Sequence, residues 1–214
     1  MAHTPSADDA RARFDAATAA HLHGPLTPEV VLEPIDAAGF NQHTQPLWAR
    51  DDARTQPLEL ARLMTEDERA MGGDLEAALG APLEHRVVLR AGDEIVGGYW
   101  GVQQSWGRYY MVQSVMRRDW QRRGLYRALL PRVIATATAA GFREIASRHR
   151  ADNNAVIIPK LKAGFAIAGL EVTPRFGMLL HLRYYPSAAL RAAFEHRIDG
   201  AHADTLRGHG LTVP

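Results

Sequence analysis

The sequence predicts a mixed α/β fold, in which helices flank one central sheet. Segments with strand character occupy residues 85–90, 94–102, 109–116 and 142–149. The Gly92-Asp93 turn between the first two segments predicts a hairpin. Stretches with helical periodicity follow the last two segments and end near Gly141 and Gly164. Strands that alternate with two helices after the hairpins give a mixed sheet.

Before residue 84 the pattern is more helical. Residues 7–21 are rich in alanine and predict a helix capped by Ser6 or Asp8, which ends before Gly24 and Pro25. Residues 30–35 predict a short first strand. Residues 58–64 and 74–79 predict two helices on either side of the glycine pair 72–73, and Gly80 is a plausible stop for the second one.

After residue 164 the pattern predicts two closing strands, at 167–172 and 176–185, and then a helix at 187–198 that Ser187 caps. We expect the tail from Asp199 to be mobile. Pro131 and Pro159 fall inside predicted helices, where we expect bends rather than breaks because the apolar periodicity continues past both. We expect residues 1–214 to form a single domain, with a helical extension at 1–25 and a helix and tail at 186–214.

Bulk properties exclude several classes of protein. The net charge of +1 gives no field that favours nucleic acid or an anionic membrane. The absence of cysteine excludes disulfides, thiolate metal sites and a cysteine nucleophile. No apolar run approaches the roughly 20 residues of a membrane span. The polar, acidic N-terminal stretch is unlike a signal peptide, so we expect a cytoplasmic protein.

A basic turn joins the strand at 109–116 to the helix that follows Gly124. The first turn of a helix carries free backbone N–H groups and about half a positive charge. Gly124 lets a ligand approach the backbone closely, and Arg122, Arg123 and Arg127 can donate charge-assisted hydrogen bonds. This pattern predicts a phosphate site.

Two motifs resemble those of the GNAT superfamily, the acyl-CoA-dependent N-acyltransferases. Residues 121–126 resemble the family pattern Gln/Arg-x-x-Gly-x-Gly/Ala, except that Tyr126 stands where a small residue is usual. Residues 153–165 resemble the later asparagine-rich helix that ends in Gly-Phe. The resemblance covers about residues 84–185. It implies a sheet whose fourth and fifth strands, here 109–116 and 142–149, splay apart around the pantetheine arm.

The resemblance implies transfer of an acyl group, most simply acetyl, from acetyl-CoA or another acyl-CoA to an amine that attacks directly. It implies that the cofactor is bound by the following residues: Met116, Gln121, Arg122, Arg123, Gly124, Leu125, Tyr126, Arg127, Asn153 and Lys160. The backbone N–H near Met116 would polarise the thioester carbonyl. The ring of Tyr126 packs either on the cofactor or in the core, and Asn153 serves as a helix cap, a pantetheine contact or both.

Lys160 occupies the position of a family tyrosine that protonates the departing thiolate. A buried lysine can carry out this chemistry, or pair with the thiolate or a phosphate, but we expect a solvent-facing helical lysine instead. The candidates for the base are His149, whose alternative is a hydrogen-bonded core histidine, and Ser114, which would act with Gln113 through water. The aromatic residues Trp100, Trp106, Tyr109 and Tyr110 either pack in the core or line an acceptor pocket.

Two other functions stay open. The chain could be a non-catalytic acyl-CoA-binding module, because the usual tyrosine is absent, or a nucleotide-binding protein of another fold. For an enzyme, the expected acceptor is a small-molecule or peptide amine, with no metal, no nucleic acid and no membrane partner. The resemblance to the family also implies a homodimer.

Overall fold

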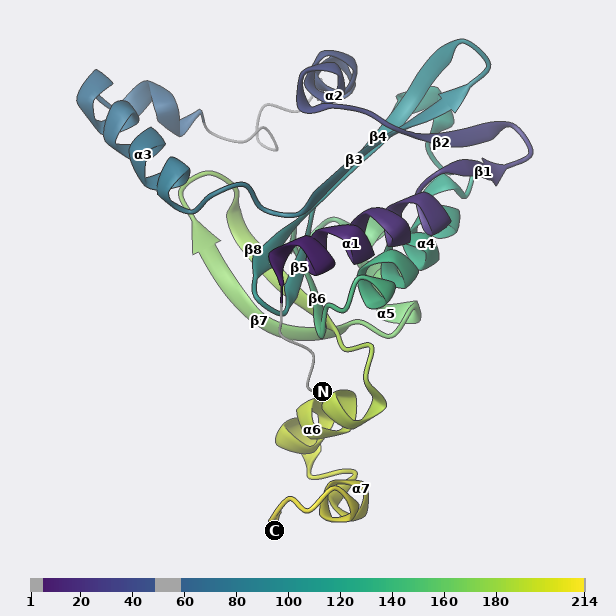
Figure 1. Ribbon diagram of the computed structural model, residues 1–214, viewed down its shortest axis with the longest axis vertical. Helices are drawn as coiled ribbons and strands as arrows, with labels where there is room; N and C mark the ends of the chain where they lie inside the picture. The colour runs from purple at the N-terminus through teal and green to yellow at the C-terminus, as the bar shows by residue number, and fades with distance from the viewer. Residues whose placement is uncertain (1–5, 49–58, 214) are drawn as a thin grey trace.

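The computed structural model describes residues 6–48 and 59–213. An eight-stranded sheet with the order β1-β2-β3-β4-β5-β6-β8-β7 forms its centre (Figure 1). The pairing of β5 with β6 is parallel, and every other neighbouring pair is antiparallel. The strands are β1 Gly24–Thr27, β2 Val30–Pro34, β3 Glu84–Ala91, β4 Glu94–Ser105, β5 Arg108–Met116, β6 Glu144–Arg150, β7 Ala166–Thr173 and β8 Gly177–Tyr184.

Helices cover both faces of this sheet. The α-helices are α1 Ala7–His21, α2 Ala37–Thr44, α3 Glu66–Ala78, α4 Leu125–Ala139, α5 Asn154–Lys162, α6 Ala188–Asp199 and α7 Ala203–Gly208. In the described residues there are also the short 3₁₀ helices η1 Gln45–Trp48, η3 Leu60–Leu63 and η4 Arg118–Trp120. The predicted mixed α/β sheet with flanking helices is therefore confirmed.

The main core lies between the sheet and the pair of helices α1 and α4, which pack side by side (Figure 1). Along β5, Tyr109 and Met111 are buried while Tyr110 is only partly buried, the alternation of a strand with one core face. α2 lies on the opposite face, where Gly98 of β4 faces its Phe40 and Thr44. The two faces of β5 therefore meet different surroundings.

The opening predicted between the strands at 109–116 and 142–149 is confirmed, and these strands are β5 and β6 in the structure. β5 and β6 are in register at three positions, which are Arg108 with Glu144, Tyr109 with Ile145 and Tyr110 with Ala146. Beyond them, the structure records no further pairing between these strands among the residues that it describes. A bulge shifts the register of β5 against β4 between Met111 and Gln113, and a bulge bends the strand that carries it. β5 and β6 diverge at this point.

Several local predictions before residue 84 are wrong. A single helix, α3, runs through Gly72 and Gly73, because glycine costs a helix only about 1 kcal/mol and does not end it. Neither β1 nor α2 was expected, and the predicted first strand is the second, β2. Only η3 lies within the helix predicted at 58–64, whose first residue falls outside the described residues. The prediction of a cap at Ser6 or Asp8 is confirmed at Ser6, whose side chain accepts from the Asp8 N–H.

Later elements follow the predictions more closely. α4 and α5 continue through Pro131 and Pro159 without a break. The tail expected to be mobile contains α7, in which Leu206 is buried. α6 and α7 extend away from the sheet (Figure 1), and α6 is joined to it by ring contact between Phe194 and Tyr185, with centroids 5.2 Å apart. In the described parts of the chain, no helix has both the length and the apolar character of a membrane span.

Candidate functional site

The turn between β5 and α4 has the backbone geometry of an anion site. Gly124 is the N-cap of α4 in the left-handed region, with φ 80°, and makes no side-chain cap hydrogen bond. Arg122 is also left-handed, with φ 62°. A Cβ added at Gly124 would meet nothing within 4 Å. The N–H groups of the first turn therefore face open space at the positive end of a 15-residue helix.

Most side chains of this turn point outward. Arg122, Arg123 and Arg127 are exposed, and the guanidinium of Arg123 lies 4.5 Å from the ring centre of Trp120. The Gln121 amide donates to the Met116 carbonyl at 3.1 Å, which ties the turn to the end of β5. Three exposed positive side chains thus lie within the turn and the first turn of α4.

Ion pairs brace the start of the turn. Arg117 donates to Asp119 at 2.7 Å and to Glu94 at 3.0 Å. These hydrogen bonds raise the pKa of Arg117 above its ordinary value and lower that of Asp119. The positive charge of Arg123 also lowers the pKa of Asp119, so this acid balances part of the charge of the turn.

Leu125 and Tyr126 point the other way, into the core. Leu125 is 3% exposed, which leaves its backbone N–H as the group that a ligand can meet. Tyr126 packs against the core, and its buried hydroxyl has no hydrogen-bond partner among the described residues. Burial raises its pKa. Tyr126 therefore takes the core-packing alternative in this structure.

The divergence of β5 and β6 leaves two strand edges facing each other. β5 bonds to β4 on its other side, and β6 bonds to β8. Between residues 111–116 and 147–150, the backbone groups on the facing edges have no ladder partner within the described residues. Backbone polar groups require partners, so this opening suits a ligand with amide groups of its own.

Lys160 of α5 is buried at the point of divergence, and the expectation of a solvent-facing lysine is wrong. It is 1% exposed. Its Nζ donates to Ser147 Oγ of β6 at 2.6 Å and contacts Met111 Sδ of β5 at 3.2 Å. Both partners directly follow the last register pair of the two strands. Burial lowers the pKa of Lys160 well below its ordinary value, which favours the neutral amine.

The two predicted bases lie on the strands that border the opening. His149 of β6 is partly buried, and its buried Nε2 has no partner among the described residues. Burial, with the nearby Lys160 charge, lowers its pKa to about 3. A histidine with this pKa is a weak base at neutral pH. Ser114 of β5 is in register with Tyr99, on the core side of the sheet.

Asn153 is the N-cap residue of α5 but makes no side-chain cap hydrogen bond. Its amide is therefore not used to cap the helix, and the partly buried side chain remains available to a ligand. The structure thus brings Asn153, Lys160 and His149 to the β6 side of the opening, and the basic turn to the end of β5.

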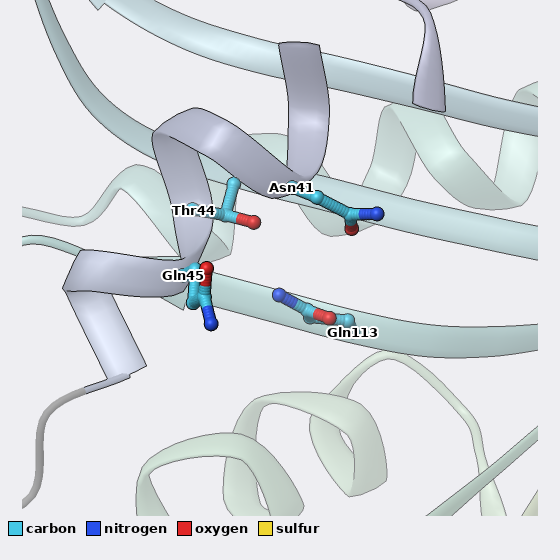
Figure 2. Close-up of a pocket in the computed structure, with 4 residues that line it drawn as sticks. All are labelled: Asn41, Thr44, Gln45 and Gln113. Atoms are coloured by element: carbon cyan, nitrogen blue, oxygen red, sulfur yellow. The ribbon is translucent and has the colours of Figure 1, made fainter. Parts of the chain in front are cut away.

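A polar pocket lies across the sheet from α4, between α2 and β5. It has a volume of about 360 Å³, and its lining residues are Asn41, Thr44, Gln45 and Gln113. Figure 2 shows their side chains gathered around one space between the helix and the strand. None of them is charged. Gln113 therefore faces this pocket rather than the core side that Ser114 faces, so the two predicted water-relay residues are on opposite faces.

The four predicted aromatic residues do not form one cluster. Tyr109 is fully buried, Trp106 is 77% exposed beside Arg143, and Trp100 donates to Glu84 at 3.1 Å. Tyr110 lines a pocket together with residues of β6 and β8. Tyr109 therefore packs in the core. Its hydroxyl oxygen lies 2.8 Å from His85 Nδ1 and 2.8 Å from the Tyr99 hydroxyl oxygen.

Sequence reasoning missed Met111, Ser147 and the lining residues on α2. Ser147 offered little signal, because Glu144, Arg148 and His149 in the same strand are polar as well. The α2 residues offered none, because their helix was not expected. Among the described residues, no group of three or more His, Cys, Asp or Glu side chains is placed to hold a metal ion.

Comparison with known proteins identifies a family and several solved structures of similar fold. The acetyltransferase (GNAT) family model matches residues 47–165. A ribosomal L7/L12 alpha-N-protein acetyltransferase in complex with coenzyme A aligns with a TM-score of 0.54 at 14% identity, over 75% of this chain and 96% of its own. Spermidine N-acetyltransferase from Vibrio cholerae, solved with CoA and spermine, aligns with a TM-score of 0.53 at 15% identity, over 74% and 96%.

A third structure, yncA from Salmonella typhimurium with its cofactor acetyl-CoA, aligns with a TM-score of 0.52 at 16% identity, over 75% and 95%. At these identities the alignments show a shared fold. No curated protein matches the chain.

Proposed function

The chain belongs to the acetyltransferase (GNAT) family, whose model matches more than half of it, and on that premise we propose that it transfers an acetyl group from acetyl-CoA to an amine by direct attack. The observation that carries the proposal is the opening between β5 and β6. It has the uncapped, basic start of α4 near one end and the buried Lys160 amine at the point of divergence. A long donor with phosphates at one end and a reactive group at the other fits this arrangement.

The residues present fit acetyl-CoA in three respects. The first-turn N–H groups of α4, with Arg122, Arg123 and Arg127, suit the phosphates. The facing strand edges offer backbone partners to the two amides of the pantetheine arm. Asn153 has a side-chain amide that does not cap its helix. We assign these groups, together with the backbone at Met116 and residues 121–127, to cofactor binding.

Acetyl-CoA supplies an activated acyl group as its thioester. Within the protein, the strand edges orient this group, and burial beside Lys160 excludes water from it. A backbone N–H near Met116 stabilises negative charge on the carbonyl oxygen. The amine attacks from the face of the sheet that carries α2, where the pocket of Figure 2 opens.

Lys160 is the group that we propose moves the proton. Its lowered pKa makes the neutral amine available as a base, and the ammonium that results can protonate or pair with the leaving thiolate. Lysine in this role replaces the tyrosine of the family pattern. We place His149 second, because a histidine with a pKa of about 3 holds a proton poorly at neutral pH. Ser114 remains a candidate for a water relay.

Acceptors among the neighbours include a ribosomal protein and spermidine, so we propose a small-molecule or peptide amine here. The test combines calorimetric titration of the protein with acetyl-CoA and a CoA-release assay over a panel of amines. Binding together with turnover supports the proposal. Binding without turnover of any amine would favour the alternative of a non-catalytic acyl-CoA-binding module. Competition by nucleotides that lack pantetheine, at the same strength as CoA, would favour a nucleotide-binding protein.

A further inference from the structure

A second pocket lies where β5 and β6 separate, on the sheet face opposite α1 and α4. Tyr110 and Ala146, the last register pair of the two strands, both line it, and so does Ser147. Its volume is about 130 Å³. Whole small-molecule sites usually measure about 300–1,000 Å³, so this pocket suits a single functional group of a larger ligand.

The lining of this pocket is cationic. Arg108 and Arg148 enter it from β5 and β6, and Arg183 and His181 enter it from β8. No acidic side chain is among its lining residues in the described chain. We call this pocket, defined by Arg108, Arg148, His181 and Arg183, the arginine pocket.

Two glutamates behind the lining do not balance its charge. Arg108 donates to Glu144 at 2.7 Å, and Arg183 pairs with the same carboxylate. In the same way, Arg148 at 2.8 Å and His181 at 2.7 Å share Glu171. Three guanidinium groups therefore face two carboxylates, which leaves a positive excess even when His181 is neutral. Burial and the neighbouring charge of Arg108 lower the pKa of Arg183, as expected for cations with too few anions nearby.

The arginine pocket also touches the opening in which the acyl group is expected. Ser147 lines the pocket, and its Oγ accepts from Lys160 Nζ at 2.6 Å. Ser147 therefore belongs both to the lining of the pocket and to the hydrogen bond with the buried lysine. Amino acids carry a carboxylate close to their amine, and the planar fork of arginine matches a carboxylate with two parallel hydrogen bonds.

We propose that the arginine pocket binds a carboxylate of the acceptor, so that the acceptor is an amine that also carries a carboxylate, such as an amino acid, rather than a polyamine. This inference rests on the proposed function. The same positive excess repels a polycation, which sets this chain apart from the spermidine acetyltransferases that share its fold.

The experiment compares matched amines in the CoA-release assay: free L-amino acids, their carboxamides, the corresponding decarboxylated amines, and spermidine. Each set keeps the reacting amine and side chain and changes only the carboxylate. We expect kcat/KM to be about ten- to a hundredfold higher for the acid than for its carboxamide, the worth of one charge-assisted bond. Spermidine should be the poorest acceptor.

Variants of Arg148 test whether the preference for the acid over its carboxamide depends on the arginine pocket. Arg148→Gln should raise the KM of the acid about tenfold or more, and leave the KM of the carboxamide and of acetyl-CoA unchanged. Arg148→Lys should restore part of the preference for the acid, which also covers the case in which the glutamine variant folds poorly. Arg90→Gln is the matched control, because Arg90 also donates to a glutamate across the sheet, Glu33 at 2.7 Å, but lies outside the pocket.

The outcomes separate the inference from the function on which it rests. Turnover of carboxamides or spermidine at rates equal to or above those of the acids overturns the carboxylate site while leaving the acetyltransferase in place. The same holds if the enzyme turns over other amines but none of the acids. Failure to bind acetyl-CoA at all removes the proposed function itself.

Discussion

Replacement of Lys160 by methionine tests the chemistry of the opening most directly. Methionine has a similar length and shape but no amine, so the variant keeps the packing against Met111 and Phe165 and loses the donor to Ser147. Lys162, two residues further along α5, is exposed. Lys162→Met is therefore a control with the same change of charge and size on the same helix.

The expected kinetic effect follows from the proposed role. Proton transfer by a positioned side chain contributes about 100- to 10,000-fold to a rate. Lys160→Met should therefore lower kcat by at least about a hundredfold, with the KM for acetyl-CoA changed by no more than about twofold. The wild-type kcat should fall at low pH as Lys160 becomes protonated, and the residual rate of the variant should lack this limb.

The same lysine predicts a dependence of stability on pH. Because its pKa is lower in the folded protein, the unfolded chain binds more protons between the folded pKa and the ordinary value of about 10.5. The free energy of unfolding should rise with pH across this window by about 1.4 kcal/mol per pH unit, relative to a protein without the group. In Lys160→Met this contribution is absent. At neutral pH the gain from removing it opposes the cost of leaving Ser147 without a donor, about 1–3 kcal/mol.

Denaturant unfolding at several pH values and steady-state kinetics measure the two effects separately. Near-normal kcat in a folded Lys160→Met variant would refute the proton-transfer role, even if the stability profile changed as expected. An unchanged stability profile would refute the buried neutral amine itself. Lys162→Met should leave both measurements as in the wild type.

The remaining predictions concern the turn and the core. Gly124→Glu should abolish acetyl-CoA binding in calorimetry, because its side chain would fill the open space before α4 and repel phosphate. Gly177→Glu controls for backbone strain, because Gly177 also has a positive φ (72°) and a Cβ added there would meet nothing within 4 Å. This control variant should bind acetyl-CoA normally. Arg122→Ala and Arg123→Ala should weaken CoA by about 1.5–3 kcal/mol each but leave a pantetheine fragment without nucleotide phosphates almost unaffected; equal losses for both ligands would mean that the arginines act through folding. Gly101→Ala should lower the free energy of unfolding by about 1–3 kcal/mol, because its Cβ would lie 1.9 Å from the Tyr109 hydroxyl. Gly169→Ala in β7 is the control, because its Cβ would meet nothing within 4 Å. Similar denaturation midpoints for the two variants would contradict this packing.

The sheet from β3 to β8 was predictable because periodicity and turn residues agree there. Gly92 and Gly124 mark a hairpin and a helix start, and both adopt the positive φ that glycine permits. The family motifs added the divergence of β5 and β6, which no local pattern shows. The register that ends at Tyr110 depends on partners far apart in the chain.

Predictions failed where the decisive interaction is tertiary. α3 carries two glycines at its centre, and the side chains of this helix that the structure describes are all exposed, so its sequence gives weak helical signals. Lys160 was expected to be exposed because lysine is rarely buried, and only the positions of Met111 and Ser147 in space reveal the site that encloses it. The arginine pocket gathers residues from three strands, which no spacing in the sequence brings together.

The three-residue seam between β5 and β6 has a mechanical consequence. It divides the eight strands into a five-stranded part and a three-stranded part that share little backbone bonding with each other. Two such parts can open as separate cooperative units, and a ligand that bonds to both edges ties their unfolding together. Within residues 147–150, the amides that point toward β5 rather than β8 should therefore exchange hydrogen fast in the free protein. In the complex with acetyl-CoA, their exchange should slow toward the rate of the core strands.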